Sequence, residues 1–193
     1  MFFILVLCTN VFGDRENAVT LLRQPDDLFT KHLRVGVRGY SGFSTPSQSM
    51  QLEISALRRI NKVCPDTPHF PRVIKVSQTT FTMTKIGHGL QKRFVSAPLP
   101  LLRAISQIEN IRTCLRKSRV RHLDIKCQNI AYESTNEVIG LIDFDISMIN
   151  NTPLTAKLAQ LTKIPGYDDT WEQHLQKVIL CCFGFVPQHA VGC

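Results

Sequence analysis

Stretches of β-favouring residues alternate with turn signals through roughly the first 90 residues of the chain. Val19 to Leu22 and Leu28 to Val37 flank the turn signal Gln24-Pro25-Asp26-Asp27, and this order predicts a β-hairpin. Apolar and polar residues then alternate from Arg72 to Ser77 and from Thr79 to Ile86, which is typical of two further strands. The first part of the chain is therefore expected to be rich in β-structure.

Apolar residues at helical spacing predict three helices. The first runs from Met50 to Lys62, after a loop from Gly39 to Gln48, and prolines end it. The second follows Pro98 and Pro100, and its apolar stripe consists of Leu101, Ala104, Ile105, Ile108, Ile111 and Leu115. The third is expected from about Asp169 to Cys182.

Between the second and third helices the pattern changes back to short strands. Ala131 to Tyr132 and Val138 to Ile142 are predicted as strands on either side of the turn Ser134-Thr135-Asn136-Glu137. The whole pattern predicts a mostly β first part and a mostly α second part, which join near Gly87 to Leu90.

Length and composition are those of one globular domain or two small lobes. The chain has 193 residues, of which 44% are apolar and 20% charged, and this excludes collagen-like, coiled-coil and disordered classes. The apolar start, Met1 to Cys8, lacks the basic residues and the cleavage site of a signal peptide, so we expect a buried first strand there. No apolar run approaches the roughly 20 residues that span a bilayer, and no membrane partner is expected.

The cysteines predict a cellular compartment, and the net charge predicts a class of binding partner. The seven cysteines form an odd count with no recurrent spacing, which predicts a reduced, intracellular protein of the cytoplasm or nucleus. The net charge of +8 favours an anionic partner, such as a nucleotide, a nucleic acid, a phosphoprotein or an anionic lipid.

One dense group of polar residues has a fixed spacing. The fixed positions of the pattern H-x-D-x-K-x-x-N are filled by His122, Asp124, Lys126 and Asn129. Asp143 follows Asp124 by 19 positions, across the predicted hairpin. Phosphoryl transfer from ATP needs a carboxylate at the acceptor hydroxyl and oxygen ligands for Mg²⁺. Asp124 fits the first need, and Asn129 with Asp143 fits the second, because Mg²⁺ takes hard oxygen ligands.

This stretch and the later Asp143-Phe144-Asp145 resemble the catalytic loop and the metal-binding loop of the eukaryotic protein-kinase family. Lys126 resembles the serine/threonine branch rather than the tyrosine branch. The resemblance implies an α+β, two-lobed fold of one domain, with a β-rich lobe over residues 1–88 and an abbreviated helical lobe over residues 89–193. It also implies ATP-dependent transfer of the γ-phosphate to serine or threonine hydroxyls of a protein substrate.

The same resemblance implies roles for the polar residues. Asp124 and Lys126 are the expected catalytic residues, and Asn129 and Asp143 are the expected ligands of Mg²⁺. The expected partners are ATP and a protein, and a nucleic-acid partner is not expected.

Residues of the first part complete the expected nucleotide site. Glu53 lies in a segment that resembles the family's first-lobe helix, which makes it the candidate partner of the phosphate-binding lysine, although taken alone it could equally be a solvated helix residue. We expect that lysine to be Lys31, which precedes Glu53 by 22 residues, and Arg38 is the alternative. Gly13 is the single glycine where the family has a Gly-rich loop.

Two further segments resemble the family. Met83 to Gly89 resembles the strand and hinge against which adenine would bind. Gly166 to Trp171 resembles the start of a helix in which Asp169 would brace the catalytic loop and Trp171 would lie in the core.

Departures from the family pattern leave two alternatives open. The chain has no G-x-G-x-x-G and no A-P-E, and Asp145 stands where the family has glycine. One alternative is a catalytically weak scaffold, a pseudokinase. The other is a small-molecule phosphotransferase of the aminoglycoside or choline type, which the Asp-Phe-Asp ending resembles and Lys126 argues against.

A run of basic residues precedes the catalytic loop, at Arg112, Arg116, Lys117, Arg119 and Arg121. We interpret it as a solvated helix face, with recruitment of an acidic substrate or nuclear import as the alternative.

Overall fold

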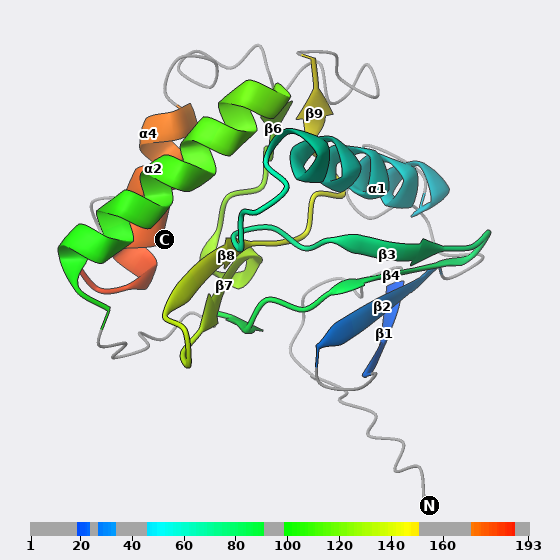
Figure 1. The fold of residues 1–193 in the computed structure, drawn as a ribbon, viewed down its shortest axis with the longest axis horizontal. Coiled ribbons are helices and arrows are strands. Elements are labelled where there is room, and N and C mark those ends of the chain that lie inside the picture. Colours follow the sequence, from blue (N-terminus) through cyan, green and yellow to red (C-terminus); the bar gives the residue numbers. More distant parts are fainter. Residues whose placement is uncertain (1–18, 24–26, 34–45, 91–98, 151–170, 188–193) are drawn as a thin grey trace, which may run out of the picture.

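The computed structural model describes residues 19–23, 27–33, 46–90, 99–150 and 171–187. Within these residues the protein is a mixture of α-helices and small β-sheets (Figure 1). The elements of the first half are β1 (Val19–Arg23), β2 (Leu28–Leu33), α1 (Pro46–Val63), β3 (Val73–Val76), β4 (Thr80–Thr84) and β5 (His88–Gly89). The elements of the second half are α2 (Leu101–Ser118), β6 (Val120–Arg121), the 3₁₀ turn η1 (Cys127–Asn129), β7 (Ile130–Glu133), β8 (Val138–Leu141), β9 (Met148–Ile149) and α4 (Trp171–Cys182).

The largest sheet is antiparallel and has the strand order β1-β2-β4-β3. The predicted hairpin is confirmed, since β1 pairs with β2 in the register that sets Val19 opposite Leu33. Side chains alternate between the two faces of a strand, so Lys31 shares a face of β2 with Phe29 and Leu33, which pack against the core. The alternation therefore directs a lysine toward the interior.

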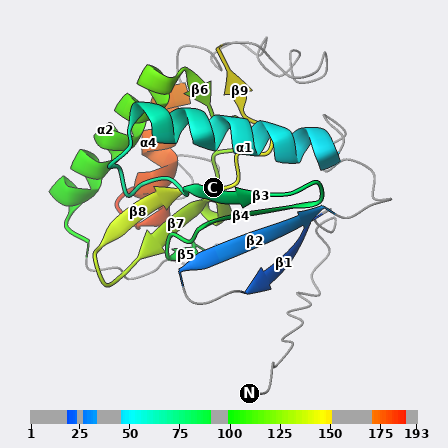
Figure 2. The same cartoon turned by 45° about the vertical axis from the view of Figure 1, so that its right-hand side comes forward.

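Helix α1 lies across one face of this sheet (Figure 2). It begins at Pro46, four residues before the predicted start, because proline suits the first turn of a helix, where no N–H is needed. Its buried face contains Ile54, Ala56, Leu57 and Ile60. Glu53 lies within that face and is only 2% exposed, so the interpretation of Glu53 as a solvated residue is wrong.

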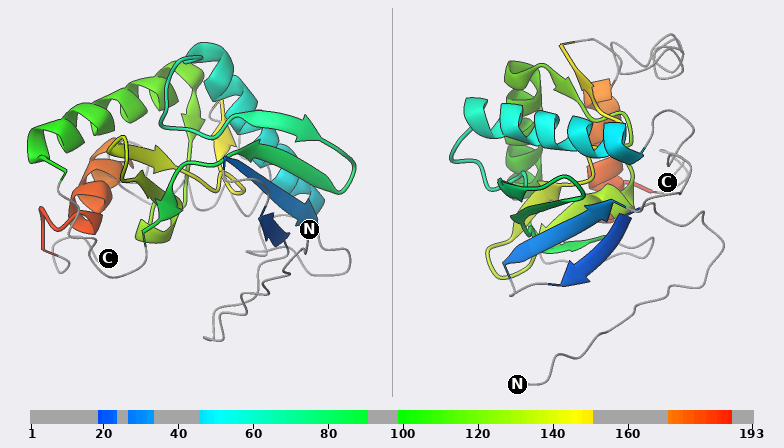
Figure 3. Two further views of the ribbon diagram at one scale, coloured as in Figure 1. Left: turned by 60° about the horizontal axis from the view of Figure 1, so that its bottom comes forward. Right: turned by 90° about the vertical axis from the view of Figure 1, so that its right-hand side faces the viewer.

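Helices α2 and α4 pack side by side (Figures 1 and 3). The predicted stripe of α2 is confirmed at Ala104, Ile108, Ile111 and Leu115, whereas it is wrong for Leu101 and Ile105, which are 44% and 40% exposed. Trp171, at the start of α4, is half-buried and packs against the same core. Helix α4 thus covers part of the buried face of α2.

The hairpin of β7 and β8 is held against α2 by two side chains of that helix, the exposed Arg103, which binds Asn136 and Glu137, and the buried Gln107. Gln107 donates from Nε2 to the carbonyl of Glu137 and accepts the backbone N–H of Ile139 at Oε1, both at 2.8 Å. The other strand of this sheet, β5, follows Gly87, whose φ is +40°. A Cβ there would overlap the carbonyl of Tyr132, so the chain needs glycine at this point.

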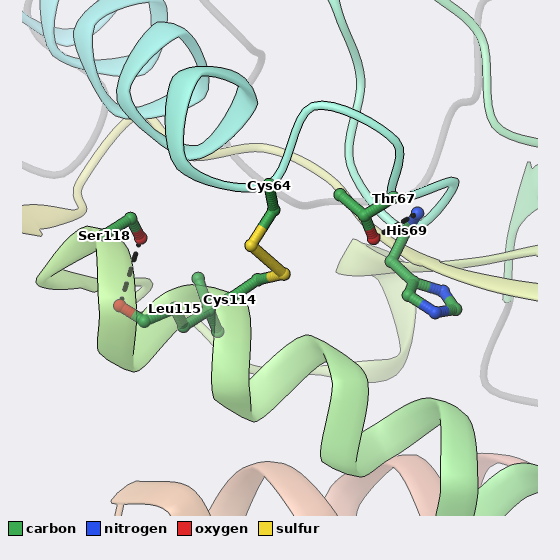
Figure 4. The surroundings of a disulfide bond; sticks show 6 residues. All are labelled: Cys64, Thr67, His69, Cys114, Leu115 and Ser118. Carbon is green, nitrogen blue, oxygen red and sulfur yellow. Dashed lines mark hydrogen bonds between the residues drawn. A yellow bond between two sulfur atoms is a disulfide. The ribbon is translucent and has the colours of Figure 1, made fainter.

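Two disulfides correct the expectation of a fully reduced protein. Cys64, just after α1, is bonded to Cys114 of α2 (Figure 4), and Cys127 of η1 is bonded to Cys182 of α4. The partners are 50 and 55 residues apart in sequence, and only the fold brings their Cα atoms to 6.0 and 5.6 Å. Cys181 is buried and free.

Some expectations lie outside the described residues. These include the first strand at Met1 to Cys8 and the reduced state of Cys8 and Cys193. In the parts of the chain that the structure describes, no helix is both long and apolar enough to cross a membrane. The intracellular location stays a prediction.

Burial predicts that two leucines of α2 contribute very different amounts to the free energy of unfolding. Leu115 is fully buried and Leu102 is 81% exposed. Leu115→Ala should lower the free energy of unfolding by about 2–5 kcal/mol, because it removes buried methyl groups and leaves a cavity. Leu102→Ala should change it by less than about 0.5 kcal/mol. Urea unfolding measures both, and equal losses would contradict the packing described here.

Candidate active site

An ion cluster of two buried residues and one partly buried residue joins three segments that are far apart in the sequence. The Nζ atom of Lys31 donates to Oε1 and Oε2 of Glu53 at 2.8 and 2.7 Å and to Oδ1 of Asp143 at 2.7 Å. Lys31 precedes Glu53 by 22 residues and Asp143 by 112 residues. Strand β2, helix α1 and the loop after β8 therefore meet at one ammonium group.

Local structure explains how each member of this cluster reaches it. Lys31 lies on the core-facing side of β2, and Glu53 lies on the core-facing side of α1. Asp143 follows β8 with a φ of 67°, in the left-handed region that aspartate tolerates better than most residues. The chain therefore turns sharply at the point where its carboxylate faces Lys31.

Burial and charge shift the pKa values of the cluster. Burial would lower the pKa of Lys31, but the carboxylates of Asp143 and Glu53 outweigh it and raise that pKa well above its usual value. Burial would raise the pKa of Asp143, but the Lys31 ammonium outweighs it and lowers that pKa. For Glu53 burial dominates and raises the pKa, although Lys31 opposes it. One ammonium thus serves two carboxylates, and the cluster has an excess of negative charge.

Asp145 is a third acid beside this cluster. Burial, and next the charge of Asp143, raise the pKa of Asp145 to about 8. Asp145 is therefore mostly protonated at neutral pH, which keeps a further negative charge out of the cluster.

A second group of side chains surrounds Asp124. Asn129 donates from Nδ2 to the carbonyl oxygen and to Oδ2 of Asp124, both at 2.9 Å. Nζ of Lys126 lies 2.7 Å from the same Oδ2. The turn η1 positions Asn129, whose backbone N–H donates to the carbonyl of Lys126 at 2.9 Å. Asn129 and Lys126 thus hold one carboxylate oxygen of Asp124 in a defined position.

Backbone hydrogen bonds and a buried histidine connect the two groups. The N–H of Ile142 donates to the carbonyl of Asn129 at 3.0 Å, which sets Asn129 beside the residue that precedes Asp143. His122 is fully buried, with Nε2 at 2.7 Å from the carbonyl of Ile142 and Nδ1 at 3.3 Å from the N–H of Asp124. These partners assign the neutral tautomer with the proton on Nε2, and burial lowers the pKa of His122, which favours the neutral form.

Phe144 packs beneath this connection. Its ring is fully buried and meets His122 edge to face at 4.5 Å between centroids, and it meets Phe70 at 6.1 Å. Asp143 and Asp145 are therefore held on either side of an aromatic anchor.

The structure brings together six of the residues selected from the sequence, in two connected groups: Lys31, Glu53 and Asp143, and Asp124, Lys126 and Asn129. Lys31 binds Glu53, as expected from the sequence. Gly13, Arg38 and Asp169 lie outside the described residues. The chemical roles of all these residues stay predictions.

Sequence reasoning missed the support of Phe144. His69 lies 2.7 Å through Nδ1 from the carbonyl of Ile139, and its own carbonyl accepts the N–H of Leu141 at 2.9 Å. These bonds join the loop before β3 to β8 and place Phe70 against Phe144. No periodic signal marks such a loop, and the only clue is an aromatic residue between two prolines.

The basic run before the loop of Asp124 is partly structural. Arg112 and Arg116 both bind Glu172 of α4, at 2.9 and 2.6 Å, and Arg112 is half-buried. Hydrogen bonds from Arg116, and the charges of both arginines, lower the pKa of Glu172. The interpretation of a simple solvated face is therefore wrong for Arg112, which connects α2 to α4.

Comparisons with known proteins find a similarity of structure and none of sequence family. No family model matches the chain, and no curated protein sequence matches it. Among solved structures, the chain is similar to the structure of the Cydia pomonella granulovirus kinase PK-1, with 13% sequence identity and a TM-score of 0.49, over 88% of this chain and 72% of that chain. Because these values are low, the function proposed below depends on this chain's own residues.

The ion cluster predicts a strong coupling between Lys31 and Glu53. Lys31→Met leaves two carboxylates without their cation and should lower the free energy of unfolding by about 3–5 kcal/mol. The double change Lys31→Met with Glu53→Gln should recover part of this loss, because the unpaired buried charge at Glu53 is then removed. Urea unfolding at pH 7 measures the cycle. Lys75→Met, on exposed β3, is the control and should cost less than about 0.5 kcal/mol.

Asp145 predicts a pH dependence of stability. Its pKa of about 8 in the folded protein lies above the usual value of about 3.9 in an unfolded chain. The folded state therefore binds more protons between these pH values, and the Asp145 contribution to stability declines as the pH rises from about 4 to 8.

Asp145→Asn removes this contribution. The variant should gain stability relative to the wild type between pH 5 and pH 8.5 in urea unfolding, while contributions from other groups cancel in the difference. Asp66→Asn, at an exposed position, is the matched control. A constant difference between Asp145→Asn and the wild type at all pH values would contradict the raised pKa.

Proposed function

We propose that this chain has a two-lobed, protein-kinase-like fold and catalyses the ATP-dependent phosphorylation of serine or threonine in proteins. The observation that carries the proposal is the position of the Lys31 ammonium, within 2.8 Å of both Glu53 and Asp143. In this proposal the first lobe lies within residues 1–88 and contains α1 with the sheet of β1 to β4. The second lobe lies within residues 89–193 and contains α2, α4 and the loop of Asp124.

Lys31 would bind phosphate oxygens of ATP. Its ammonium is buried and its raised pKa keeps it charged, which suits a group that neutralises phosphate. On nucleotide binding it would exchange the carboxylate of Asp143 for phosphate oxygens, while Glu53 continues to hold it. Backbone groups of Met83 to Gly89 would receive the adenine.

Asn129 and Asp143 would hold Mg²⁺. The Nδ2 of Asn129 is bonded to Asp124, so the amide oxygen is the atom of this side chain that suits a metal, and Asp143 supplies a carboxylate. No group of three or more His, Cys, Asp and Glu suited to a metal occurs among the described residues. Two protein ligands fit Mg²⁺, which is usually bound through one or two carboxylates together with phosphates and water. When bound, the ion would neutralise the phosphate oxygens during transfer.

Asp124 would act at the acceptor hydroxyl. Asn129 and Lys126 fix this carboxylate through Oδ2, and the carboxylate would accept the proton of a serine or threonine hydroxyl. The hydroxyl oxygen would bond to the γ-phosphorus as the bond to the β,γ-bridging oxygen breaks, which leaves ADP. Lys126, whose side chain is partly exposed, would neutralise charge on the transferring phosphoryl group.

The proposed partners are ATP and an intracellular protein, with Lys126 as the feature that favours a protein acceptor. One observation favours two other candidates, a small-molecule phosphotransferase and a scaffold with weak nucleotide affinity. Asp145 stands where the protein-kinase family has glycine, and it lies close enough to Asp143 for the charge of Asp143 to raise its pKa. Such an acidic ending resembles phosphotransferases that act on amino-sugars or choline.

Loss of the Asp124 carboxylate should abolish most of the proposed activity. Transfer of labelled phosphate from ATP to a generic basic or acidic protein should fall at least about 100-fold in Asp124→Asn, because that residue accepts the hydroxyl proton. Asp66→Asn is again the control and should leave the rate unchanged. Equal incorporation by the wild type and Asp124→Asn would reject the assignment.

Binding and acceptor choice separate the candidates. Mg²⁺-dependent binding of ATP, measured by calorimetry, should be lost in Asp143→Ala. No binding by the wild type at millimolar ATP would favour the scaffold. Turnover with amino-sugars or choline, and none with proteins, would favour the small-molecule enzyme.

A further inference from the structure

One of the two disulfides lies inside the loop that carries the candidate catalytic residues. Cys127 is the first residue of η1, directly after Lys126 and two residues before Asn129. Its partner Cys182 is the last residue of α4. The bond therefore joins the loop of Asp124 to a helix 55 residues further along the chain.

This bond restrains the backbone that positions Asn129. The N–H of Asn129 donates to the carbonyl of Lys126, and the carbonyl of Asn129 accepts the N–H of Ile142, so both hydrogen bonds flank Cys127 closely. Helix α4 is a firm anchor, because Leu175 and Ile179 are fully buried. A covalent tie to α4 limits the excursions of η1, and with them those of the Asn129 side chain that holds Asp124.

We propose that Cys127 and Cys182 form a reversible thiol–disulfide modification site that sets the order of the catalytic loop. Low-molecular-weight thiols of the glutathione class would open the bond, and the loop would then lose order. The loop effect stands on the geometry alone, whereas the effect on phosphoryl transfer rests on the function proposed above.

The chemistry is an ordinary two-step exchange. A glutathione thiolate attacks Sγ of Cys127, which is half-buried, whereas Cys182 is only 6% exposed. The sulfur–sulfur bond breaks, Cys182 leaves as a thiolate and takes up a proton, and Cys127 carries glutathione. A second glutathione thiolate releases Cys127, so two glutathione molecules become one glutathione disulfide and the protein gains two thiols.

The second disulfide provides a matched control. Cys64–Cys114 connects the end of α1 to α2, and none of the candidate active-site residues is a direct neighbour of either cysteine in sequence (Figure 4). Without it, Arg59 still donates to the carbonyl of Ser118, and the apolar faces of α1 and α2 still pack. Loss of this bond should therefore lower stability without loosening η1.

Hydrogen exchange tests the inference on the full chain without nucleotide. Wild-type protein is equilibrated with oxidised or reduced glutathione, and alkylation with mass spectrometry records the state of each cysteine. We expect the amides of Asn129 and Ile142 to exchange at least tenfold faster after reduction. The double variant Cys127→Ser/Cys182→Ser should show fast exchange in both conditions, and Cys64→Ser/Cys114→Ser should keep the response of the wild type.

The outcomes separate this inference from the proposed function. Exchange that is unchanged while Cys127 and Cys182 become reduced overturns the inference, whether or not the protein transfers phosphate. Faster exchange in a protein that neither binds nor uses ATP supports the redox site and rejects the kinase function. Where the Cys127→Ser/Cys182→Ser variant fails to fold, the Cys64→Ser/Cys114→Ser variant decides, because Cys127–Cys182 is then the one disulfide of the described residues that glutathione can open. For an active enzyme we expect phosphoryl transfer to fall about tenfold on reduction and to return on reoxidation.

Discussion

The ammonium group of Lys31 is the point on which the arrangement of the described residues depends. It is buried together with the Glu53 carboxylate, beside the partly buried carboxylate of Asp143, and the charge of Lys31 or of Glu53 would be costly to bury alone. Glu53 can therefore occupy the interior at low cost only while Lys31 lies beside it. This requirement fixes the face that β2 turns inward, the rotation of α1 and the path of the chain after β8.

Backbone hydrogen bonds and packed aromatic rings connect the loop of Asp124 to this cluster and so position the loop. Ile142 lies next to Asp143, and its N–H donates to the carbonyl of Asn129 while its carbonyl accepts from Nε2 of His122. Phe144, on the other side of Asp143, fills the space between His122 and Phe70. A buried neutral histidine suits this place, because it links two backbone groups without adding a charge that would have to be paired. The disulfide at Cys127 supplements these contacts with a covalent restraint.

Excess negative charge gives the cluster its chemical character. One cation faces Glu53 and Asp143, and a third acid, Asp145, avoids ionisation near neutral pH. Such a group is stable only while something shares the negative charge, and in this protein Lys31 does so. A divalent cation at Asp143 would relieve the same excess and free Lys31 for phosphate, so the electrostatics of the cluster support the proposed nucleotide chemistry as the motif does.

The sequence by itself determined what depends on neighbours along the chain. Alternation predicted the hairpin that directs Lys31 inward, helical spacing predicted the stripes of α1 and α2, and the fixed spacing around Asp124 selected the polar residues that meet there. Tertiary structure alone decided what depends on contacts between distant segments. The burial of Glu53, the contact of Lys31 with Asp143 across 112 residues, the support of Phe144 by Phe70 and the pairing of Cys127 with Cys182 all belong to this class. The reason is that periodicity records only which face of an element is apolar, whereas the partner that completes a charge pair, a ring contact or a disulfide is chosen by the packing of whole elements.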